Sequence, residues 1–372
     1  MNDPIYITRS DMPPIEEYFH EIAPLWESRR LTNNGILHER FQKELQKYLQ
    51  VENVGLFCNG HIALSSIIRT MNLSGEIITT PFTFVSTTHA ITENGIEPVF
   101  CDIKPNNCTI DPKKIEELIT EKTSAILAVH VYGNLCDIEA IDKIAKKHNL
   151  KVIYDAAHAI GVTKKGIGAG CFGDASMFSF HATKLFHSIE GGCVTFSDKS
   201  LIEPLERIKN FGIYRGGEED IEYGSNGKMN EFSSAMGLCN LRRINQVIEK
   251  RANVYWQYQK LLGGIEGVKI ALDLTEANHN FAYFPVLFDK EKLGFGRDDV
   301  LKELRNDNIY ARRYFYPLIP DFPYYKNRFN YTVPTAKDIA DNILCLPMYA
   351  DLSPEDINRI CKVIIRMFGK SF

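Results

Sequence analysis

The stretch SMFSFHATKLFHSIEGGCVTF, residues 176–196, decides the fold of this chain. Its first five residues, Ser176–Phe180, and its last four, Cys193–Phe196, are short apolar runs typical of buried strands. Gly191 and Gly192 precede the second run and permit backbone angles that other residues avoid. We therefore expect a strand, a loop and a second strand, with one lysine, Lys184, in the loop.

Lys184 stands between Thr183 and Leu185 in this apolar neighbourhood. Burial lowers the pKa of an ammonium group and frees the neutral amine as a nucleophile, so a buried loop lysine suggests covalent catalysis. Most lysines are solvated, and Lys184 taken alone also fits an ordinary surface loop. The rest of the sequence is needed to choose between a catalytic lysine and an ordinary surface lysine.

Composition excludes several classes of protein. The chain has 372 residues, 44% hydrophobic and 24% charged, which is typical of a globular protein with a large core. Its net charge is −4 without a block of Lys or Arg, which argues against nucleic-acid binding. No apolar run is long enough for a membrane span, and no signal peptide is evident. Nine cysteines without metal-ligand spacing predict free thiols, no metal site and a cytoplasmic location.

Apolar segments alternate with helical ones along the first half of the chain. Strands are expected at 54–58, 76–80, 98–102, 124–129 and 151–155, and helices from about residues 62, 84, 111 and 137. This alternation predicts an α/β fold with a mostly parallel sheet between helices. Because ligands of such sheets bind beyond the carboxyl ends of the strands, polar residues at those ends are candidates for an active site.

The pattern changes after residue 243. A glycine-rich connection at 211–228 and a helix at 229–240 precede this point. A second, long helix is expected after it, from Ile244 to Leu262. Later segments are expected as strands at 269–272, 282–287 and 311–316 and as helices at 298–306 and from Ser353-Pro354 onwards. We therefore predict an N-terminal arm and large domain over residues 1–243 and a smaller α+β domain over 244–372.

Several candidate residues lie at the strand ends. Asp155 closes one strand, and Phe84 follows another. Gly60-His61 opens a helix after a strand, a geometry that directs free backbone N–H groups at an anion. Each also has an ordinary explanation: a helix cap or surface turn for Asp155, a core position for Phe84, and a plain connection for Gly60-His61.

Taken together, these residues match the requirements of pyridoxal phosphate (PLP). Its aldehyde requires a lysine, and its pyridine nitrogen requires a carboxylate that keeps the ring protonated. Its phosphate requires backbone N–H groups and hydroxyls, and its ring requires an aromatic partner. Lys184, Asp155, Gly60-His61 with Ser179, and Phe84 would supply these groups, in this order.

The same segments resemble the DegT/DnrJ/StrS family of PLP-dependent sugar aminotransferases. The resemblance covers essentially the whole chain and is carried by NGHIAL (59–64), TPFTFVSTTHA (80–90), VHVYG (129–133), YDAAHAIG (154–161), FSFHATK with EGG (178–192), NGKMNE (226–231) and LPMY (346–349). It implies the aspartate aminotransferase-like fold, fold type I, in which a mostly parallel seven-stranded sheet lies between helices.

The resemblance also implies roles for individual residues. Lys184 would bind the cofactor aldehyde and act as acid and base, and Asp155 would pair with the pyridine nitrogen. The other cofactor contacts would be His158 near the phenolic oxygen, Phe84 on the ring, Ser179 with Gly60 and His61 at the phosphate, and Asn226 at the phosphate of a neighbouring subunit. The last contact implies a homodimer with shared active sites. The chain departs from the family at His61, where Thr or Ser is usual, and at Ile319, where His is usual.

The implied reaction moves an amino group from L-glutamate to a nucleotide-linked keto-sugar. NGKMNE and ARRYFYPLI (311–319) are most similar to enzymes that act at C4 of dTDP-4-keto-6-deoxy-D-glucose, giving dTDP-4-amino-4,6-dideoxyglucose for O-antigen or polysaccharide synthesis. Arg312, Arg313 and Tyr314 are candidates for binding the substrate, although the arginines also fit a solvated strand edge.

Several alternatives remain open. A 3-keto or GDP-linked sugar could replace the dTDP-linked 4-keto-sugar. A PLP-dependent sugar dehydratase would have histidine in place of the lysine; His181 and His187 lie nearby, but Lys184 holds the motif position. A non-catalytic binder of sugar or cofactor would not require the complete set of lysine, carboxylate and aromatic.

Overall fold

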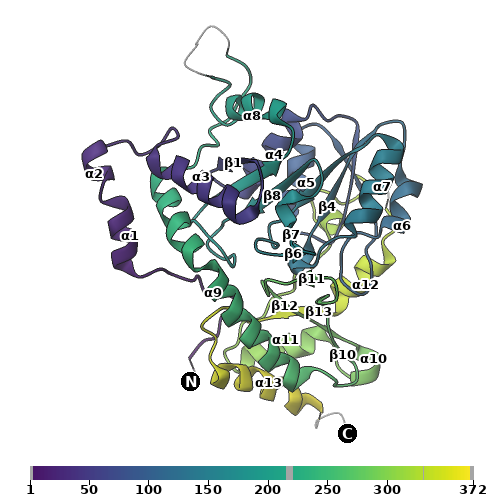
Figure 1. Ribbon diagram of the computed structural model, residues 1–372. Helices are drawn as coiled ribbons and strands as arrows, with labels where there is room; N and C mark the ends of the chain where they lie inside the picture. Colours follow the sequence, from purple (N-terminus) through teal and green to yellow (C-terminus); the bar gives the residue numbers. More distant parts are fainter. Residues whose placement is uncertain (1–2, 215–220, 330, 369–372) are drawn as a thin grey trace.

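The structure, a computed structural model, describes residues 3–214, 221–329 and 331–368 (Figure 1). Residues 215–220 belong to the glycine-rich connection expected at 211–228, and they lie outside the described residues. Figure 1 shows a larger region around one sheet, a smaller region below it, and a long helix, α9, that runs from one region to the other.

A seven-stranded sheet forms the centre of the larger region. In the described parts of the chain its strand order is β1-β9-β8-β5-β4-β2-β3. Its strands are β1 (Asn53–Phe57), β2 (Glu76–Thr79), β3 (Glu97–Phe100), β4 (Thr123–Val129), β5 (Lys151–Asp155), β8 (Ala175–Ser179) and β9 (Gly192–Phe196). Pairing is parallel from β3 through β2, β4 and β5 to β8, and β9 is antiparallel to both β8 and β1. The predicted α/β fold with a mostly parallel sheet is confirmed.

The strands are apolar because both faces of the sheet are covered. Alternate residues point to opposite faces. Ile77 of β2 and Ile153 of β5 pack with α4 (Gly60–Thr70) and α5 (Val85–Thr92). Ile78 and Val152, one residue away along the same strands, pack with α7 (Ile138–His148) on the other face. A sheet buried on both sides explains the unbroken apolar runs in the sequence.

Short polar side chains begin the connecting helices as expected. Asp137 accepts a hydrogen bond from the N–H of Ala140 at the start of α7, and Asp111 accepts one from Lys113 at the start of α6 (Pro112–Ile115). Both carboxylates satisfy N–H groups that have no partner inside their helix. The helix expected from about residue 111 ends at Ile115, and a 3₁₀ turn, η1 (Glu116–Leu118), follows it.

One helix replaces the two that were expected between residues 229 and 262. Helix α9 (Glu231–Leu262) is continuous over 32 residues, so the predicted break is wrong. After Gly237 the helix contains no Gly or Pro that would end it. Its first half packs against α3 (Ile36–Leu49), and its second half joins the core of the smaller region. The predicted boundary at 243/244 therefore falls inside α9, and the division into two domains stays a prediction.

A three-stranded antiparallel sheet organises the smaller region, which we call the small-sheet region. Its strand order is β10-β12-β13, formed by β10 (Val268–Ile270), β12 (Phe284–Phe288) and β13 (Ile343–Leu346). Helices α11 (Arg297–Asn306) and α13 (Pro354–Phe368) pack with the second half of α9 around its core. Ser353 caps α13 by accepting from the N–H of Asp356, as expected.

Several shorter elements complete the two regions. They are α8 (Ile202–Ile208), α10 (Lys290–Leu293), α12 (Pro334–Asn342), and a small sheet of β6 (Thr163–Lys164), β7 (Ile167–Gly168) and β11 (Ala277–Asn278). The strand expected at 311–316 is absent from the described residues there: only Arg312 pairs, with Cys345, and the chain then turns. The aromatic side chains of this segment pack against the region around the seven-stranded sheet, which we call the large-sheet region. They do not continue the hydrogen-bonded pairing with β13.

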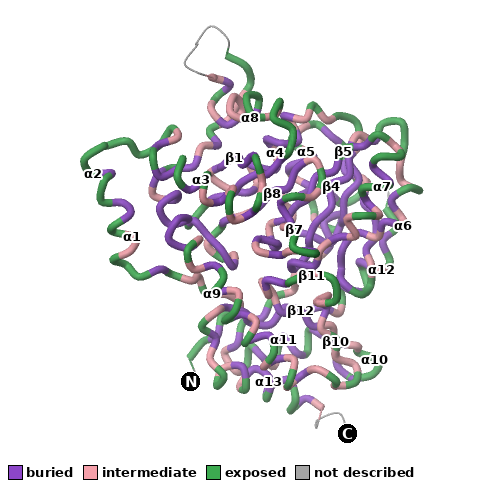
Figure 2. Tube along the Cα trace, viewed as in Figure 1, coloured by how far each residue is buried: buried purple, intermediate pink, exposed green. Residues whose placement is uncertain are grey.

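Residues 3–12 form an N-terminal arm that contacts both regions. Ile5 pairs with Ile309 and is buried in the core of the small-sheet region. The arm leads into α1 (Ile15–Ile22), which packs on α9, and then α2 (Leu25–Ser28). Figure 1 shows α1 and α2 projecting from the side of the molecule, and Figure 2 shows that much of α2 is exposed.

None of the helices in the described ranges is long and apolar enough to cross a membrane. Those ranges also contain no cluster of three or more metal-ligand side chains. All nine cysteines are free thiols, and most are buried.

Candidate active site

The candidate residues meet at the carboxyl ends of the parallel strands. Asp155 is the last residue of β5, and Ser179 is the last residue of β8. Gly60 begins α4 directly after β1, and Phe84 precedes α5 after β2. Because these strands run in one direction, the sheet brings together residues that are far apart in the sequence, at the edge where ligands of α/β sheets bind.

Asp155 is a buried carboxylate held by two hydrogen bonds. Its Oδ2 accepts from Thr87 Oγ1 at 2.8 Å, and its Oδ1 accepts from the N–H of Ala157 at 3.1 Å. Burial raises the pKa of Asp155, while these two hydrogen bonds and the nearby charge of Lys184 oppose that shift. A positive partner would therefore stabilise the charged carboxylate at this position.

Lys184 is half-buried in the loop between β8 and β9. Burial lowers the pKa of its ammonium group, and the nearby carboxylate of Asp155 opposes that shift. Its Nζ lies 3.5 Å from the hydroxyl of Tyr283, and its backbone N–H donates to the carbonyl of His181 at 2.9 Å. The surroundings of Lys184 agree with the sequence-based expectation, which stays a prediction, that its amine serves as a base or nucleophile.

His158 is buried beside Lys184, and its orientation is defined. Its Nδ1 accepts from the N–H of Tyr132 at 3.0 Å, so the neutral ring carries its proton on Nε2. Burial lowers the pKa of His158 well below its usual value. Its ring contacts those of Tyr283, at 4.6 Å between centroids, and Phe315, at 6.0 Å. His158 is thus a neutral hydrogen-bond donor.

The start of α4 is pressed against the ends of β8 and β9. A Cβ on Gly60 would lie 3.0 Å from the Cβ of Ser179, and one on Gly192 would lie 2.6 Å from the Cα of Gly60. Asn59 caps the helix by accepting from the N–H of Ile62 at 2.8 Å. The N–H groups of Gly60 and His61 have no partner inside the helix, and Ser179 is next to them. This arrangement suits an anion such as a phosphate.

The imidazole of His61 is directed towards α5. Its Nδ1 lies 3.0 Å from Ser86 Oγ, and its Nε2 lies 3.1 Å from Glu93 Oε2. The ring therefore contacts a neighbouring helix, and the backbone N–H of His61 is the group that is left for the predicted phosphate contact. Asn226 lies beside the chain that enters α4, because its carbonyl accepts from the thiol of Cys58 at 3.8 Å.

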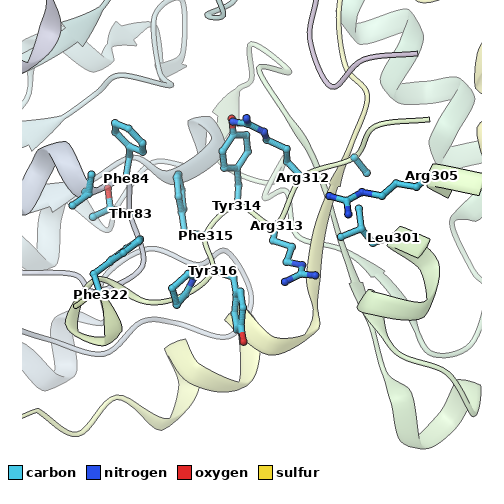
Figure 3. Close-up of a pocket in the computed structure, with 13 residues that line it drawn as sticks. Thr83, Phe84, Leu301, Arg305, Arg312, Arg313, Tyr314, Phe315, Tyr316 and Phe322 are labelled. Carbon is cyan, nitrogen blue, oxygen red and sulfur yellow. The ribbon is translucent and has the colours of Figure 1, made fainter. Parts of the chain in front are cut away.

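A cavity of about 420 Å³ opens between the large-sheet region and the small-sheet region (Figure 3). Phe84, which is 60% exposed, stands on one side of it. Residues 311–317 form another side and include Arg312, Arg313 and Tyr314, with Arg305 of α11 beyond them. Figure 3 shows Phe84 and Phe315 near each other and the three arginines farther along the cavity.

The sequence did not identify three residues of this site. Thr87, which bonds to Asp155, lies one helical turn after Phe84, so its place on α5 was a usable signal. Tyr132 and Tyr283 come from a 3₁₀ turn after β4 and from the residue before β12. Tyr132 lies within VHVYG (129–133), but local sequence carries no signal for Tyr283, because only the folded chain brings it next to Lys184.

The two histidines of the lysine loop, and also Ile319, make contacts that are explained by the structure of the chain. The Nε2 of His187 lies 2.7 Å from the carbonyl of Asp11, and the Nδ1 of His181 lies 2.8 Å from Thr183 Oγ1. Ile319 is buried, and its N–H donates to the carbonyl of Pro81. Lys184, rather than either histidine, is therefore the residue of this loop that is grouped with Asp155.

These residues fit PLP. The buried carboxylate of Asp155 suits a protonated pyridine nitrogen, and the desolvated amine of Lys184 suits an aldehyde. The N–H groups at the start of α4, with Ser179, suit the phosphate. Phe84 is exposed at the cavity although it is a large apolar side chain, as expected of an aromatic that would stack on a bound ring.

Comparisons with known proteins agree with this geometry. Residues 15–365 match the model of the DegT/DnrJ/EryC1/StrS aminotransferase family. The chain is 43% identical over 365 residues to dTDP-4-amino-4,6-dideoxy-D-glucose transaminase from Shigella dysenteriae, covering 98% of this chain and 99% of that protein. It is 39% identical over 373 residues to the protein of the same name from Escherichia coli, covering 98% and 99%.

A solved structure matches the whole fold. The crystal structure of DesI in the presence of its TDP-sugar product superposes with a TM-score of 0.95 at 30% identity. The match covers 100% of this chain and 95% of that one. The fold of this chain, with its large sheet and its small-sheet region, therefore has a close counterpart in that structure.

Proposed function

The chain belongs to the DegT/DnrJ/EryC1/StrS aminotransferase family, and we propose that it transfers the amino group of L-glutamate to C4 of dTDP-4-keto-6-deoxy-D-glucose. Members of the family are PLP-dependent sugar aminotransferases that act on nucleotide-linked keto-sugars, and this chain is one of them. The product of the proposed reaction is dTDP-4-amino-4,6-dideoxyglucose, a precursor for O-antigen or another polysaccharide. The grouping of Lys184, Asp155 and Thr87 at one sheet edge is the observation that carries the proposed chemistry.

PLP, when bound, supplies an aldehyde that takes up the amino group and a protonated ring that accepts electrons from the reacting carbon. Lys184 is the residue that would hold this aldehyde. Asp155 would hold the proton on the ring nitrogen, and Thr87 and the N–H of Ala157 fix the orientation of that carboxylate. His158 would donate from Nε2, because its Nδ1 is already an acceptor.

Lys184 also serves as the proton carrier. Burial favours the neutral form of its amine, which could accept a proton from the α-carbon of an amino-acid donor held beside it. A proton taken from the α-carbon of the donor can then be delivered by the same amine. In the second half of the reaction the same steps run in reverse on the keto-sugar.

The cavity is the proposed site for the nucleotide-linked sugar. Arg312, Arg313 and Tyr314, the residues predicted to bind the substrate, all line it. Guanidinium groups match the geometry of phosphate oxygens. The arginine side of the cavity therefore suits the diphosphate, and the aromatic side near Phe84 suits the sugar that reacts.

We also propose a homodimer with shared active sites and a cytoplasmic location. Asn226 is exposed beside the start of α4, where its amide could contact the phosphate site of a second subunit. Large apolar residues are exposed along α1 and α2, among them Ile15, Phe19 and Trp26. An exposed apolar surface of this kind suits a contact between subunits. The free thiols suit a reducing compartment.

Product analysis with a panel of keto-sugars tests the proposed substrate. Purified protein is incubated with PLP, glutamate and dTDP-, UDP- or GDP-linked 4-keto-6-deoxy-sugars or a dTDP-linked 3-keto-sugar, and aminated products are identified by mass spectrometry. We expect the dTDP-linked 4-keto-sugar to give the highest kcat/KM. A preference for the GDP-linked or 3-keto substrate would contradict the proposal, and loss of water without amination would indicate a dehydratase.

A further inference from the structure

We propose that Arg312 binds the α-carboxylate of the amino-acid donor, and that the diphosphate of the sugar substrate is bound farther out, on the side of Arg313 and Arg305. This inference rests on the proposed function and refines it. It divides the arginine side of the cavity into an inner and an outer anion site. The division follows from the contacts of each guanidinium group and from its place relative to Lys184.

Contacts between aromatic side chains connect Arg312 to Lys184. Arg312 Nη1 donates to the hydroxyl of Tyr314 at 2.9 Å. The ring of Tyr314 packs edge-on against that of Tyr283, with 5.8 Å between centroids. The hydroxyl of Tyr283 lies 3.5 Å from Lys184 Nζ. The guanidinium of Arg312 is thus separated from the reacting amine by two phenol side chains.

The backbone of Arg312 is fixed. Its N–H donates to the carbonyl of Cys345 at 3.0 Å, and its carbonyl accepts from the N–H of Cys345 at 2.8 Å. Cys345 is a buried residue of β13. An arginine that starts from a rigid backbone loses less conformational freedom when it binds an anion.

Arg313 points the opposite way and already has a partner. Its Nε lies 3.1 Å from Asp298 Oδ1, and its guanidinium lies 5.5 Å from the ring of Tyr316. Figure 3 shows the guanidinium groups of Arg312 and Arg313 directed away from each other, with that of Arg312 beside the hydroxyl of Tyr314. Within the described ranges, no carboxylate oxygen lies within 4 Å of Arg312 or Arg305. Both are therefore free to bind an anionic substrate.

The shapes of the two substrates indicate which anion binds at the inner site and which at the outer site. The α-carboxylate of an amino acid is about 1.5 Å, one bond, from the carbon that reacts beside Lys184. Its partner must therefore be an arginine close to Lys184, and Arg312 is the arginine bonded to the inner aromatic wall. In a sugar that reacts at C4 the diphosphate is attached to C1, on the opposite side of the ring. It therefore lies farther from Lys184, where Arg313 and Arg305 line the cavity.

Calorimetry on the PLP-loaded protein tests the assignment without turnover. The probes are 2-oxoglutarate, which carries the donor's carboxylates but no amine, and dTDP, which carries the diphosphate but no keto-sugar. Arg312→Gln should weaken 2-oxoglutarate about 10- to 100-fold and leave dTDP within about threefold, because charge-assisted hydrogen bonds are lost only in the first case. Arg305→Gln, which removes the same charge from the same cavity, is the matched control and should affect dTDP more than 2-oxoglutarate.

A conservative variant separates hydrogen-bond geometry from charge. Arg312→Lys keeps the charge and loses the planar fork, so it should recover only part of the affinity for 2-oxoglutarate. The midpoint of thermal unfolding of each variant shows that it is folded. Single-turnover reaction with glutamate, followed by the absorbance of the bound cofactor, should show the same ranking.

Three results would overturn the inference: wild-type affinity of Arg312→Gln for 2-oxoglutarate, an equal loss in Arg305→Gln, or a loss in Arg312→Gln that is confined to dTDP. Failure of the proposed function would look different. The wild-type protein would still react with glutamate, and Arg312→Gln would still impair that reaction, but no aminated dTDP-sugar would form. The two outcomes are therefore distinguishable in one set of experiments.

Discussion

Lys184 is the residue on which the proposed chemistry depends. Lys184→Ala should still bind PLP through the remaining contacts, but it should lose at least about 10²- to 10⁴-fold in turnover, because both the covalent anchor and the proton carrier are removed. Borohydride treatment followed by peptide mass spectrometry should attach the cofactor to Lys184 in the wild-type protein. Lys199→Ala, at an exposed lysine, is the control and should retain full activity. Full activity in Lys184→Ala would remove the residue from its role.

Tyr283 is one of the residues of the site that the sequence did not reveal. Its oxygen accepts a hydrogen bond from the protonated amine of Lys184 at 3.5 Å, so Tyr283→Phe should disfavour the charged amine and lower the pKa of Lys184 further. We expect kcat to fall about 2- to 10-fold and the acidic limb of the pH–rate profile to move to lower pH.

Tyr258→Phe is a suitable comparison for Tyr283→Phe. It also removes a buried phenol hydrogen bond, to the carbonyl of Pro347, but it lies in the core of the small-sheet region. It should lower stability and leave the pH–rate profile unchanged. An unshifted profile in Tyr283→Phe would show that Tyr283 has only a packing role.

At the scale of elements, the start of α4 defines the proposed phosphate site. Gly60→Ala would place a methyl group 3.0 Å from Ser179 Cβ and 3.1 Å from Met177 Sδ, so the helix would have to move away from β8. We expect affinity for PLP, measured by titration of the cofactor-free protein, to fall by about tenfold or more, because the backbone N–H groups leave their position. Gly296→Ala, where the nearest atom is 3.4 Å away, should leave PLP affinity unchanged.

The same scale shows what the sequence could and could not predict. Strand β5 was predicted at its observed bounds, 151–155, because apolar runs between polar turns report burial on both faces of a sheet. The strand predicted at 311–316 was wrong, because the apolar residues of this segment pack across two regions. The local sequence pattern does not contain such long-range contacts. The break in α9 was wrong because the apolar pattern changes partner within one continuous helix, from α3 to the core of the small-sheet region.

The candidate site was predictable to the extent that it follows strand ends. Asp155 and Ser179 were found because they terminate strands, and Lys184 because its loop joins two of them. Tyr283 approaches Lys184 from a different region of the chain, 99 residues later. Similarly, neighbouring positions in the sequence suggested one role for Arg312 and Arg313, whereas the folded chain directs their side chains to different partners.

The whole molecule should lose stability in mild acid. Burial lowers the pKa of His38 and of His130 to about 3, so both are neutral in the folded protein. In the unfolded chain their pKa is about 6.5. The unfolded state therefore binds more protons between these two values, and stability decreases as the pH falls below about 6.5, by up to about 1.4 kcal/mol per pH unit for each histidine.

Denaturant titrations between pH 7 and pH 4.5 measure this dependence. In His38→Phe the slope should be smaller. Neither ring nitrogen of His38 has a hydrogen-bond partner among the described residues, so the variant should also lose little stability at pH 8. His20→Phe, at an exposed histidine, is the control and should keep the wild-type slope. An unchanged slope in His38→Phe would show that His38 does not contribute to acid sensitivity.

The N-terminal arm has a consequence for how the protein is made. Its hydroxyls donate to the lysine loop, from Ser10 to the carbonyl of Ala182 at 2.7 Å and from Thr8 to that of Thr183 at 3.2 Å. The arm is itself held by residues close to the other end of the chain, through Ile5 at Tyr310 and Ile7 at Met348. On the ribosome, the arm emerges long before these partners are synthesised. A nascent chain that already contains Lys184 therefore lacks the arm's support for that loop until translation has passed residue 348.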